Sequence, residues 1–172
     1  MIVSDVELRG IYEKIVMAMG HPDPIGYITR AIMCSAGESQ YIGGDGKMGF
    51  MPIEPERAKE MVGSENMLDL YMNVMTTVTI DMMYFSKYND LDDMVIAFHW
   101  GEEMVKDVGE YSGEQKQFLK NMEEGREQII NIVSPPRATV EDVMRMIRDE
   151  MMGKNKPKKI VLDLVNLMLG ER

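Results

Sequence analysis

Apolar and polar residues follow each other along this chain with the period of an α-helix over most of its length. The first such stretch, residues 5–19, carries its apolar face on Val6, Ile11, Ile15 and Met19. Later stretches repeat the spacing and are separated by breaks that contain proline or glycine, residues that disfavour helix. The pattern therefore predicts an all-α fold. The expected helices span residues 5–19, 25–38, 55–63, 64–88 and 113–132, with one more that begins at Asp92 or Asp93 and runs to Trp100.

The ends of two of these helices are predicted from single residues. Pro55 suits the first turn of a helix and Gly63 the position just past its end, so a short helix is expected between them. Ser64 is then the expected cap of the long helix that runs to residue 88. Residues 76–80 of that helix are β-branched, so we expect tertiary packing to override their weak helix propensity.

The clearest boundary in the chain is Ser134-Pro135-Pro136, because proline ends a helix and restricts the residue before it. We expect a domain over residues 1–133 and a C-terminal helical appendage over residues 134–172. The appendage is predicted to be a helical pair, over residues 139–153 and 157–169, with an apolar face on each helix. Such faces need to be buried against the domain or against a partner protein.

Composition and charge exclude some classes of function. With 45% hydrophobic residues the chain can bury a substantial core. Residues 1–109 hold 18 Asp/Glu against 8 Lys/Arg, whereas residues 110–172 hold 11 of each, so the net charge of −10 lies in the first part. An acidic surface opposes binding to nucleic-acid phosphates. Cys34 is the single cysteine and is expected to be a buried structural thiol.

The twenty methionines leave two interpretations open, irregular core packing or an adaptable recognition surface. The chain begins without the basic and apolar run of a signal peptide, and we find no segment apolar enough to span a bilayer. We therefore expect a protein that stays in the cytoplasm or leaves it by another route. Neither a metal nor a cofactor is expected.

Glu38 is the first candidate for chemistry. It follows the apolar run Ile32-Met33-Cys34 and stands directly before a glycine-rich loop. Cleavage of a glycosidic bond needs a carboxylic acid that protonates the leaving oxygen, and burial against apolar neighbours keeps such an acid protonated near neutral pH. The sequence is compatible with an apolar pocket of this kind around Glu38. Asp45 and Glu54 are the nearest second acids, although Asp45 suits a turn and Glu54 suits the cap of the next helix.

Three segments, taken in order, resemble the soluble lytic transglycosylase and goose-type lysozyme family, which cleaves the glycan strands of peptidoglycan. The family pattern is a helix that ends in Glu-Ser, a Gly-Leu-Met-Gln-x-x-Pro loop and an Ala-Tyr-Asn-Ala-Gly turn. The resemblance implies an all-α, lysozyme-like domain of the lytic transglycosylase type in residues 1–133. The corresponding segments here are Glu38-Ser39, Gly49-Phe50-Met51-Pro52-Ile53-Glu54-Pro55 and Ala97-Phe98-His99-Trp100-Gly101.

The resemblance also implies roles for eight residues. Glu38 would be the single catalytic acid and base: it would protonate the oxygen between N-acetylmuramic acid and N-acetylglucosamine, and then activate the C6 hydroxyl of the muramoyl ring or a water. For His99 and Trp100, packing inside the protein is the alternative to sugar contact. The residues implied to contact the glycan are Ser39, Gly49, Phe50, Met51, Phe98, His99 and Trp100.

Several positions depart from the family pattern: His99 stands where the family has an asparagine, and three further departures remove groups that serve the family's chemistry. Pro52 stands where the family has a glutamine that touches the substrate, and Phe98 and Phe118 stand where it has tyrosines. Tyr41 and Tyr111 are candidates to supply the missing hydroxyl groups. The departures favour a second interpretation, a catalytically weak or inactive relative that serves as a structural component of a virion or another assembly. A third interpretation is a methionine-rich helical adaptor unrelated to the family. It would mean that the three family-like segments occur in this order by coincidence.

The predicted function is cleavage of the peptidoglycan glycan strand by a bacteriophage protein. A chain without a signal peptide or a wall-binding module fits a muralytic protein that travels in the virion and acts during genome entry. It also fits an enzyme held in the host cytoplasm until release. The expected partners are the glycan strand and, through residues 134–172, other virion proteins.

Overall fold

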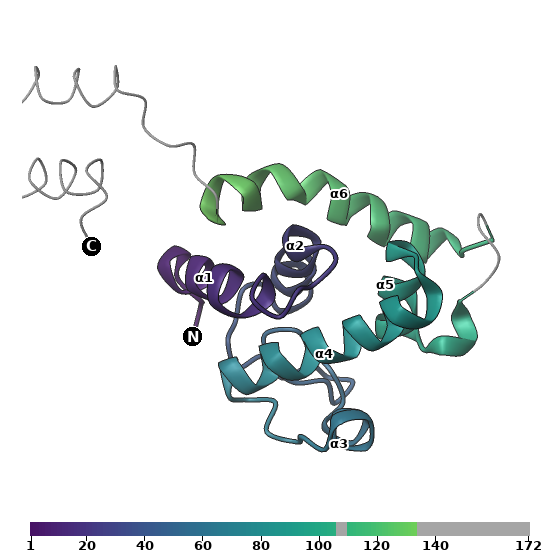
Figure 1. Cartoon of the computed structure of the whole chain (residues 1–172), viewed down its shortest axis with the longest axis horizontal. Coiled ribbons are helices and arrows are strands. Elements are labelled where there is room, and N and C mark those ends of the chain that lie inside the picture. Colours follow the sequence, from purple (N-terminus) through teal and green to yellow (C-terminus); the bar gives the residue numbers. More distant parts are fainter. Residues whose placement is uncertain (106–109, 134–172) are drawn as a thin grey trace, which may run out of the picture. The chain divides into compact units, whose positions relative to one another are not determined.

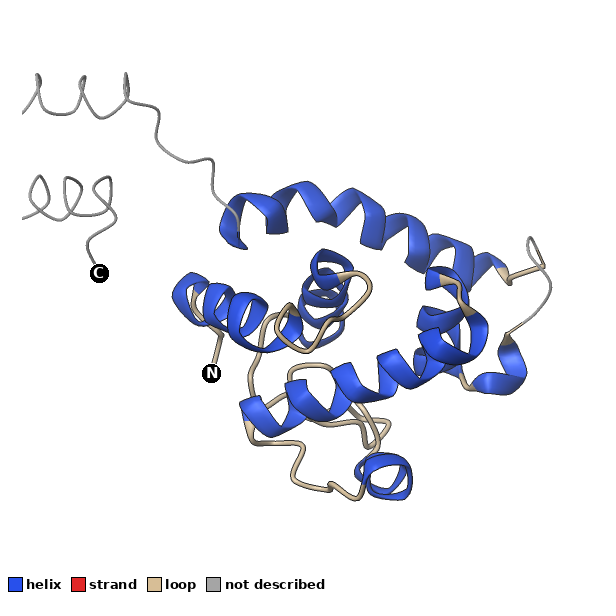
Figure 2. Cartoon of the chain, in the orientation of Figure 1, coloured by secondary structure: helices blue, strands red, loops and turns tan. Residues whose placement is uncertain are grey.

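The computed structural model describes residues 1–105 and 110–133, where the regular structure is helical (Figures 1 and 2). A π-helical turn and a 3-10 turn accompany the α-helices, and within these residues only isolated β-bridges occur, without a strand. The expected all-α class is confirmed. The elements are α1 (Asp5–Ile11), η1 (Tyr12–Val16), α2 (Pro24–Ser35), α3 (Pro55–Val62), α4 (Leu70–Tyr88), α5 (Leu91–Trp100), η2 (Glu102–Met104) and α6 (Gly113–Val133).

The chain divides into two compact units, Met1–Pro135 and Pro136–Arg172. The two helices expected over residues 139–153 and 157–169 lie outside the described residues. Among the helices that are described, none combines the length and apolarity needed to cross a membrane.

Among the described α-helices, all except α4 begin within two residues of the predicted start. α3 starts at Pro55 and ends before Gly63, whose φ of 75° is the left-handed conformation common just past a helix end. α5 starts at Leu91, slightly ahead of the predicted Asp92 or Asp93. The Asp90 side chain caps it by accepting the N–H of Asp93 at 3.0 Å.

The predicted start of α4 is wrong. The helix begins at Leu70, and the Asp69 side chain, not that of Ser64, accepts a backbone N–H of its first turn. Met67, which lies between the two candidate caps, is 1% exposed and belongs to the core. A helix that started at Ser64 would include Met67, so the packing of the connecting segment decides between two residues with similar capping ability.

The buried residues of the first helical stretch do not follow a single α-helical period. α1 continues directly into the π-helical turn η1. Its buried residues are Leu8, Ile11 and Val16, and the five-residue step between the last two is the spacing of a π-helix. Val6 is exposed although it was predicted to share the buried face. The prediction fails because five residues separate Val6 from Ile11, which places the two side chains about 140° apart around an α-helix and so on different faces.

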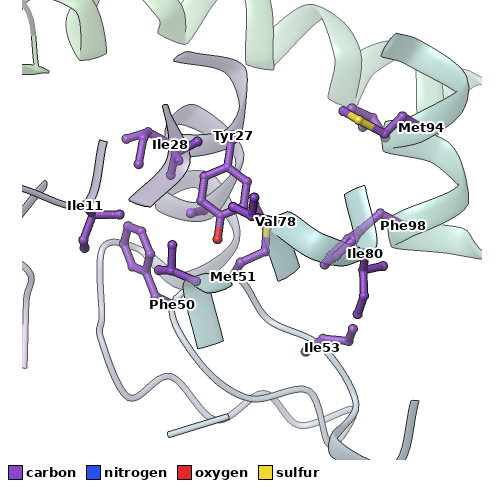
Figure 3. Close-up of a cluster of buried hydrophobic side chains, with 14 of the residues drawn as sticks. Ile11, Tyr27, Ile28, Phe50, Met51, Ile53, Val78, Ile80, Met94 and Phe98 are labelled. Carbon is purple, nitrogen blue, oxygen red and sulfur yellow. The ribbon is translucent and has the colours of Figure 1, made fainter. Parts of the chain in front are cut away.

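The helices surround a common core. α4 packs against α3, α5 and η1, and α2 packs against α6 and η1 (Figure 1). The core side chains labelled in Figure 3 come from α1, α2, α4 and α5 and from the loop before α3. Methionines occur both in this core and on the surface. Met51, Met67, Met94 and Met122 are buried, whereas Met17, Met72, Met75 and Met83 are exposed.

A buried ion pair joins α2 to α4. Arg30 of α2 and Asp81 of α4 are both 0% exposed, and Arg30 Nη2 donates a hydrogen bond to Asp81 Oδ2. His21 Nε2 lies 3.0 Å from the same oxygen. Because His21 Nδ1 accepts the N–H of Asp23 at 3.0 Å, the proton of the neutral ring is on Nε2 and is donated to Asp81.

The β-branched part of α4 is held by contacts with other helices, as expected. Thr77 Oγ1 donates to the carbonyl of Asn73 at 2.8 Å and lies 2.7 Å from the hydroxyl of Tyr27 on α2. All three residues are 0% exposed. Burial and these hydrogen bonds compensate for the weak helix propensity of the run.

Candidate functional site

The loop that carries the second family-like segment is fixed to the start of α4 by the side-chain amide of Asn73. Asn73 Oδ1 accepts the N–H of Met51 at 2.8 Å, and Asn73 Nδ2 donates to the Met51 carbonyl at 3.1 Å. Gly49 lies against the same amide with a φ of +98°. A Cβ atom on Gly49 would lie 2.1 Å from Asn73 Nδ2 and 2.4 Å from the carbonyl oxygen of Met67. Only glycine fits this position.

Two hollows lie beside this loop and share Lys47 and His99. The large hollow has a volume of about 650 Å³ and the small hollow a volume of about 180 Å³. The large hollow is lined by Lys47, Glu54, Arg57, Tyr84, His99, Trp100, Gly101, Glu102 and Glu103. The small hollow is lined by Cys34, Tyr41, Asp45, Lys47, Pro52 and His99.

His99 is packed among aromatic rings at the junction of the hollows. Its ring centroid lies 5.0 Å from that of Phe98, 4.9 Å from that of Phe118 and 5.7 Å from that of Trp100. Nε2 is shielded from water and has no hydrogen-bond partner among the residues that the structure describes. Burial holds the pKa of His99 well below its ordinary value, and the positive charge of Arg30 adds to the effect. The imidazole is therefore neutral near pH 7 and can hydrogen-bond a polar group of a ligand.

The cationic residues of the hollows already have protein partners. Lys47 Nζ lies 3.3 Å from Asp45 Oδ2 and 4.0 Å from Glu54 Oε1. Arg57 donates to the carbonyl oxygens of Ala97 and Phe98. Both charges are thus fixed in position, a requirement for orienting a ligand.

Glu38, the predicted last residue of the helix over residues 25–38, lies beyond the end of α2 and lines neither hollow. α2 ends at Ser35, and Ala36 and Gly37 adopt left-handed conformations with φ of 52° and 77°. These two residues turn the chain, so Glu38 forms an isolated antiparallel bridge with Ile2. Its side chain is exposed, and the expected apolar pocket around it is absent from the described residues.

Most of the residues implied to contact a glycan are buried. Phe50 and Met51 are 0% exposed and lie in the core near Tyr27 and Ile11 (Figure 3), so they offer no surface to a sugar. Gly49 and Phe98 are buried as well. The structure gives no support to direct contact at these four positions, because the residues are packed inside the protein and line neither hollow.

The remaining three residues that were implied to contact the glycan differ in their exposure to solvent. Ser39 is 3% exposed, and its N–H and hydroxyl both donate to the carbonyl of Met1, at 2.8 and 3.0 Å. It therefore holds the segment of Glu38 in place. His99 and Trp100 are partly exposed and line the large hollow.

The secondary candidates also have defined positions. Asp45 is a turn residue, since its carboxylate accepts the N–H of Lys47 at 3.2 Å. Glu54 occupies the cap position of α3 without a capping hydrogen bond from its side chain. Cys34 is half-buried, and burial raises the pKa of its thiol, which opposes a role as nucleophile. Tyr111 donates its hydroxyl proton to Asp93, whereas Tyr41 lines the small hollow.

Sequence reasoning missed several lining residues. Arg57 comes from α3, Tyr84 from the C-terminal part of α4 and Lys47 from the glycine-rich loop. Nothing in the residues flanking Arg57 or Tyr84 distinguishes them from other surface positions of an amphipathic helix. Only the packing of α3 against α4 brings them to one place.

The fold and the hollows define this chain as an all-α protein with a polar and aromatic site between the end of α5 and the loop before α3. No protein-family model, curated protein or solved structure matches it.

Acidification is expected to destabilise the protein through His99, whose pKa is depressed mainly by burial. Histidine in an unfolded chain takes up a proton near pH 6.5, whereas folded His99 stays neutral to a much lower pH. Below about pH 6.5 the unfolded state therefore binds more protons. The free energy of unfolding should fall there by up to about 1.4 kcal/mol per pH unit, and the full contribution should be present above that pH.

Urea unfolding between pH 7.5 and 5.0 measures this dependence in the wild type and in His99→Gln. Other titrating groups are common to both proteins, so the difference between their slopes belongs to His99. The variant should show the smaller slope. Equal slopes would contradict the depressed pKa.

Proposed function

We propose that this protein binds the glycan strand of peptidoglycan across the two hollows and cleaves it with Glu38 as the acid and base. One observation carries the proposal: the small hollow is lined by Tyr41, three residues after Glu38, by Lys47 and Pro52, and by His99. Those residues come from, or lie next to, the three segments that resemble the family. Their meeting at one hollow is the arrangement that the resemblance requires of segments spread over about sixty residues of sequence.

The chemistry of the lining suits a sugar chain. Trp100 offers an aromatic surface on which a pyranose ring can stack. The neutral ring of His99 and the ammonium group of Lys47 can hydrogen-bond hydroxyl and amide groups of the strand. A bound strand that covered Glu38 would remove water from its carboxyl group, which favours the protonated form that a general acid needs.

A second candidate is a glycan-binding or structural relative without activity. It is favoured by the exposure of Glu38, since an acid that is buried before the substrate arrives is the usual arrangement. Phe98 and Phe118, which lack the tyrosine hydroxyls of the family pattern, favour it as well. For either candidate we propose a bacteriophage setting, in the virion or in the host cytoplasm before release, with residues 134–172 as the segment that contacts other virion proteins.

Glu38→Gln is expected to lower the release of muropeptides from peptidoglycan sacculi by at least about 100-fold, the typical contribution of a general acid. Mass spectrometry of the products identifies the reaction. Anhydro-muropeptides would show transfer to the C6 hydroxyl, and reducing ends would show hydrolysis.

Glu54→Gln is the matched control, because it removes a carboxylate that lines the large hollow. It should retain activity within a few-fold. Loss in Glu54→Gln with full activity in Glu38→Gln would assign the acid to Glu54 and refute the role of Glu38. A wild type that releases nothing from several wall types would refute cleavage and favour the structural candidate.

A further inference from the structure

The ring of Phe98 lies between two guanidinium groups. Arg30 Cζ is 5.5 Å from the ring centroid and Arg57 Cζ is 5.9 Å from it. Arg30 belongs to α2 and is bound to Asp81, whereas Arg57 belongs to α3. The last turn of α5 is thus held from two other helices by cation–π contacts.

Arg57 also binds the backbone of this turn. Its Nη1 donates to the carbonyl oxygen of Phe98 at 2.7 Å, and its Nη2 donates to that of Ala97 at 2.8 Å. The Ala97 carbonyl also accepts the N–H of Gly101 at 3.1 Å, so the guanidinium is a second donor to that oxygen. A cation at the C-terminal end of a helix interacts favourably with its carbonyl groups and anchors the turn. Nη2 lies 2.8 Å from the hydroxyl of Tyr84 as well, which connects the group to α4.

These bonds join two parts of the chain that line the large hollow. One part carries Glu54 and Arg57, at the start of α3. The other carries His99 and Trp100, which directly follow the two carbonyl groups that Arg57 binds, and continues to Glu103. One guanidinium group therefore connects α3 to the two residues that directly precede His99 and Trp100.

We propose that Arg57 is a positioning residue that fixes the last turn of α5, so that Trp100 and His99 present their rings to the large hollow. Its effect on ligand affinity rests on the proposed function, whereas its effect on Trp100 does not. Lysine cannot substitute fully, because a single ammonium group does not reproduce the planar fork of donors that reaches two carbonyl groups and a hydroxyl.

Trp100 is the single tryptophan of the chain, so its fluorescence reports on this turn alone. The experiment compares acrylamide quenching of ligand-free wild type, Arg57→Lys and Arg57→Met. The matched control is Arg126→Met, which removes an arginine that binds Asp23 at the start of α2 and does not line either hollow. Thermal unfolding of all four proteins measures the loss of stability.

The quenching constant is expected to rise about twofold in Arg57→Met, to rise less in Arg57→Lys and to stay unchanged in Arg126→Met, although both methionine variants lose stability. Unchanged quenching in the folded Arg57 variants would overturn the proposal and leave Arg57 a purely stabilising residue. Arg57→Lys keeps the test decisive if Arg57→Met does not fold.

A titration with a soluble tetrasaccharide of alternating N-acetylmuramic acid and N-acetylglucosamine then tests whether Arg57 affects ligand affinity. Its affinity should fall about tenfold in Arg57→Met, a change of about 1.4 kcal/mol, and should be retained in Arg126→Met. Wild type that does not bind the tetrasaccharide would refute the proposed function, while the quenching comparison would still decide the role of Arg57. An equal loss of affinity in both methionine variants would refute a specific contribution of Arg57 to the site.

Discussion

Replacing Asp81 with asparagine is expected to lower the free energy of unfolding by about 3–5 kcal/mol, because the change leaves the buried guanidinium of Arg30 without a countercharge. Both side chains are fully buried, so water cannot compensate the lost interaction. The asparagine is nearly isosteric, and the expected loss is therefore electrostatic rather than a packing defect. Urea unfolding at pH 7.5, followed by circular dichroism, measures it.

A double-mutant cycle with Arg30→Met provides the control. Each single change leaves one buried charge without a partner of opposite charge, whereas the double variant leaves none. The loss of unfolding free energy in the double variant should therefore be clearly smaller than the sum of the two single losses. Asp69→Asn is a matched surface change, since Asp69 caps α4 and asparagine caps helices equally well. Additive losses in the cycle, or a loss below about 1 kcal/mol in Asp81→Asn, would contradict the dependence of Arg30 on Asp81.

Gly49→Ala is expected to lower the free energy of unfolding by about 2–5 kcal/mol, the sum of backbone strain and overpacking. The alanine would have to adopt a φ of +98° and would place its Cβ against the amide of Asn73. Relief of the clash would displace Asn73 and with it the loop that leads to the hollows. Thermal and urea unfolding give the stability, and the fluorescence of Trp100 reports whether the hollow changes.

Gly46→Ala separates the two contributions. Gly46 also has a positive φ, of 86°, but a Cβ there would meet no atom within 4 Å. The loss of unfolding free energy in Gly46→Ala should therefore come from backbone strain alone, about 1–2 kcal/mol. Equal losses at the two positions would mean that the close approach to Asn73 contributes nothing.

Local signals in the sequence predicted the helices well, because helix formation depends on apolar spacing and on residues at the ends. Proline at the start of α3 and the glycine after it sufficed to predict that element. The start of α4 was not predictable in this way. Ser64 and Asp69 are both competent caps, and the burial of Met67 in the core excludes the first.

The candidate site was predicted only in part, for a related reason. The sequence order of the segments suggested His99 and Trp100, which line the large hollow. It also suggested Phe50 and Met51, whose apolar character is equally suited to a sugar-binding floor and to a core. Arg57 and Tyr84 reach the hollow through the packing of helices, a long-range effect without a local signature.

The π-helical turn at Tyr12–Val16 makes one part of the chain tolerant of a change in length. Such a turn holds one residue more than an α-helical path between the same flanking positions, so natural variants that lack a residue there could form a continuous α-helix. The buried sides of Leu8 and Val16 would keep their directions in such variants. Loss of a residue inside α2 or α4 would instead rotate everything beyond it by about 100°. Evolutionary gain and loss of single residues is therefore expected to concentrate at this turn.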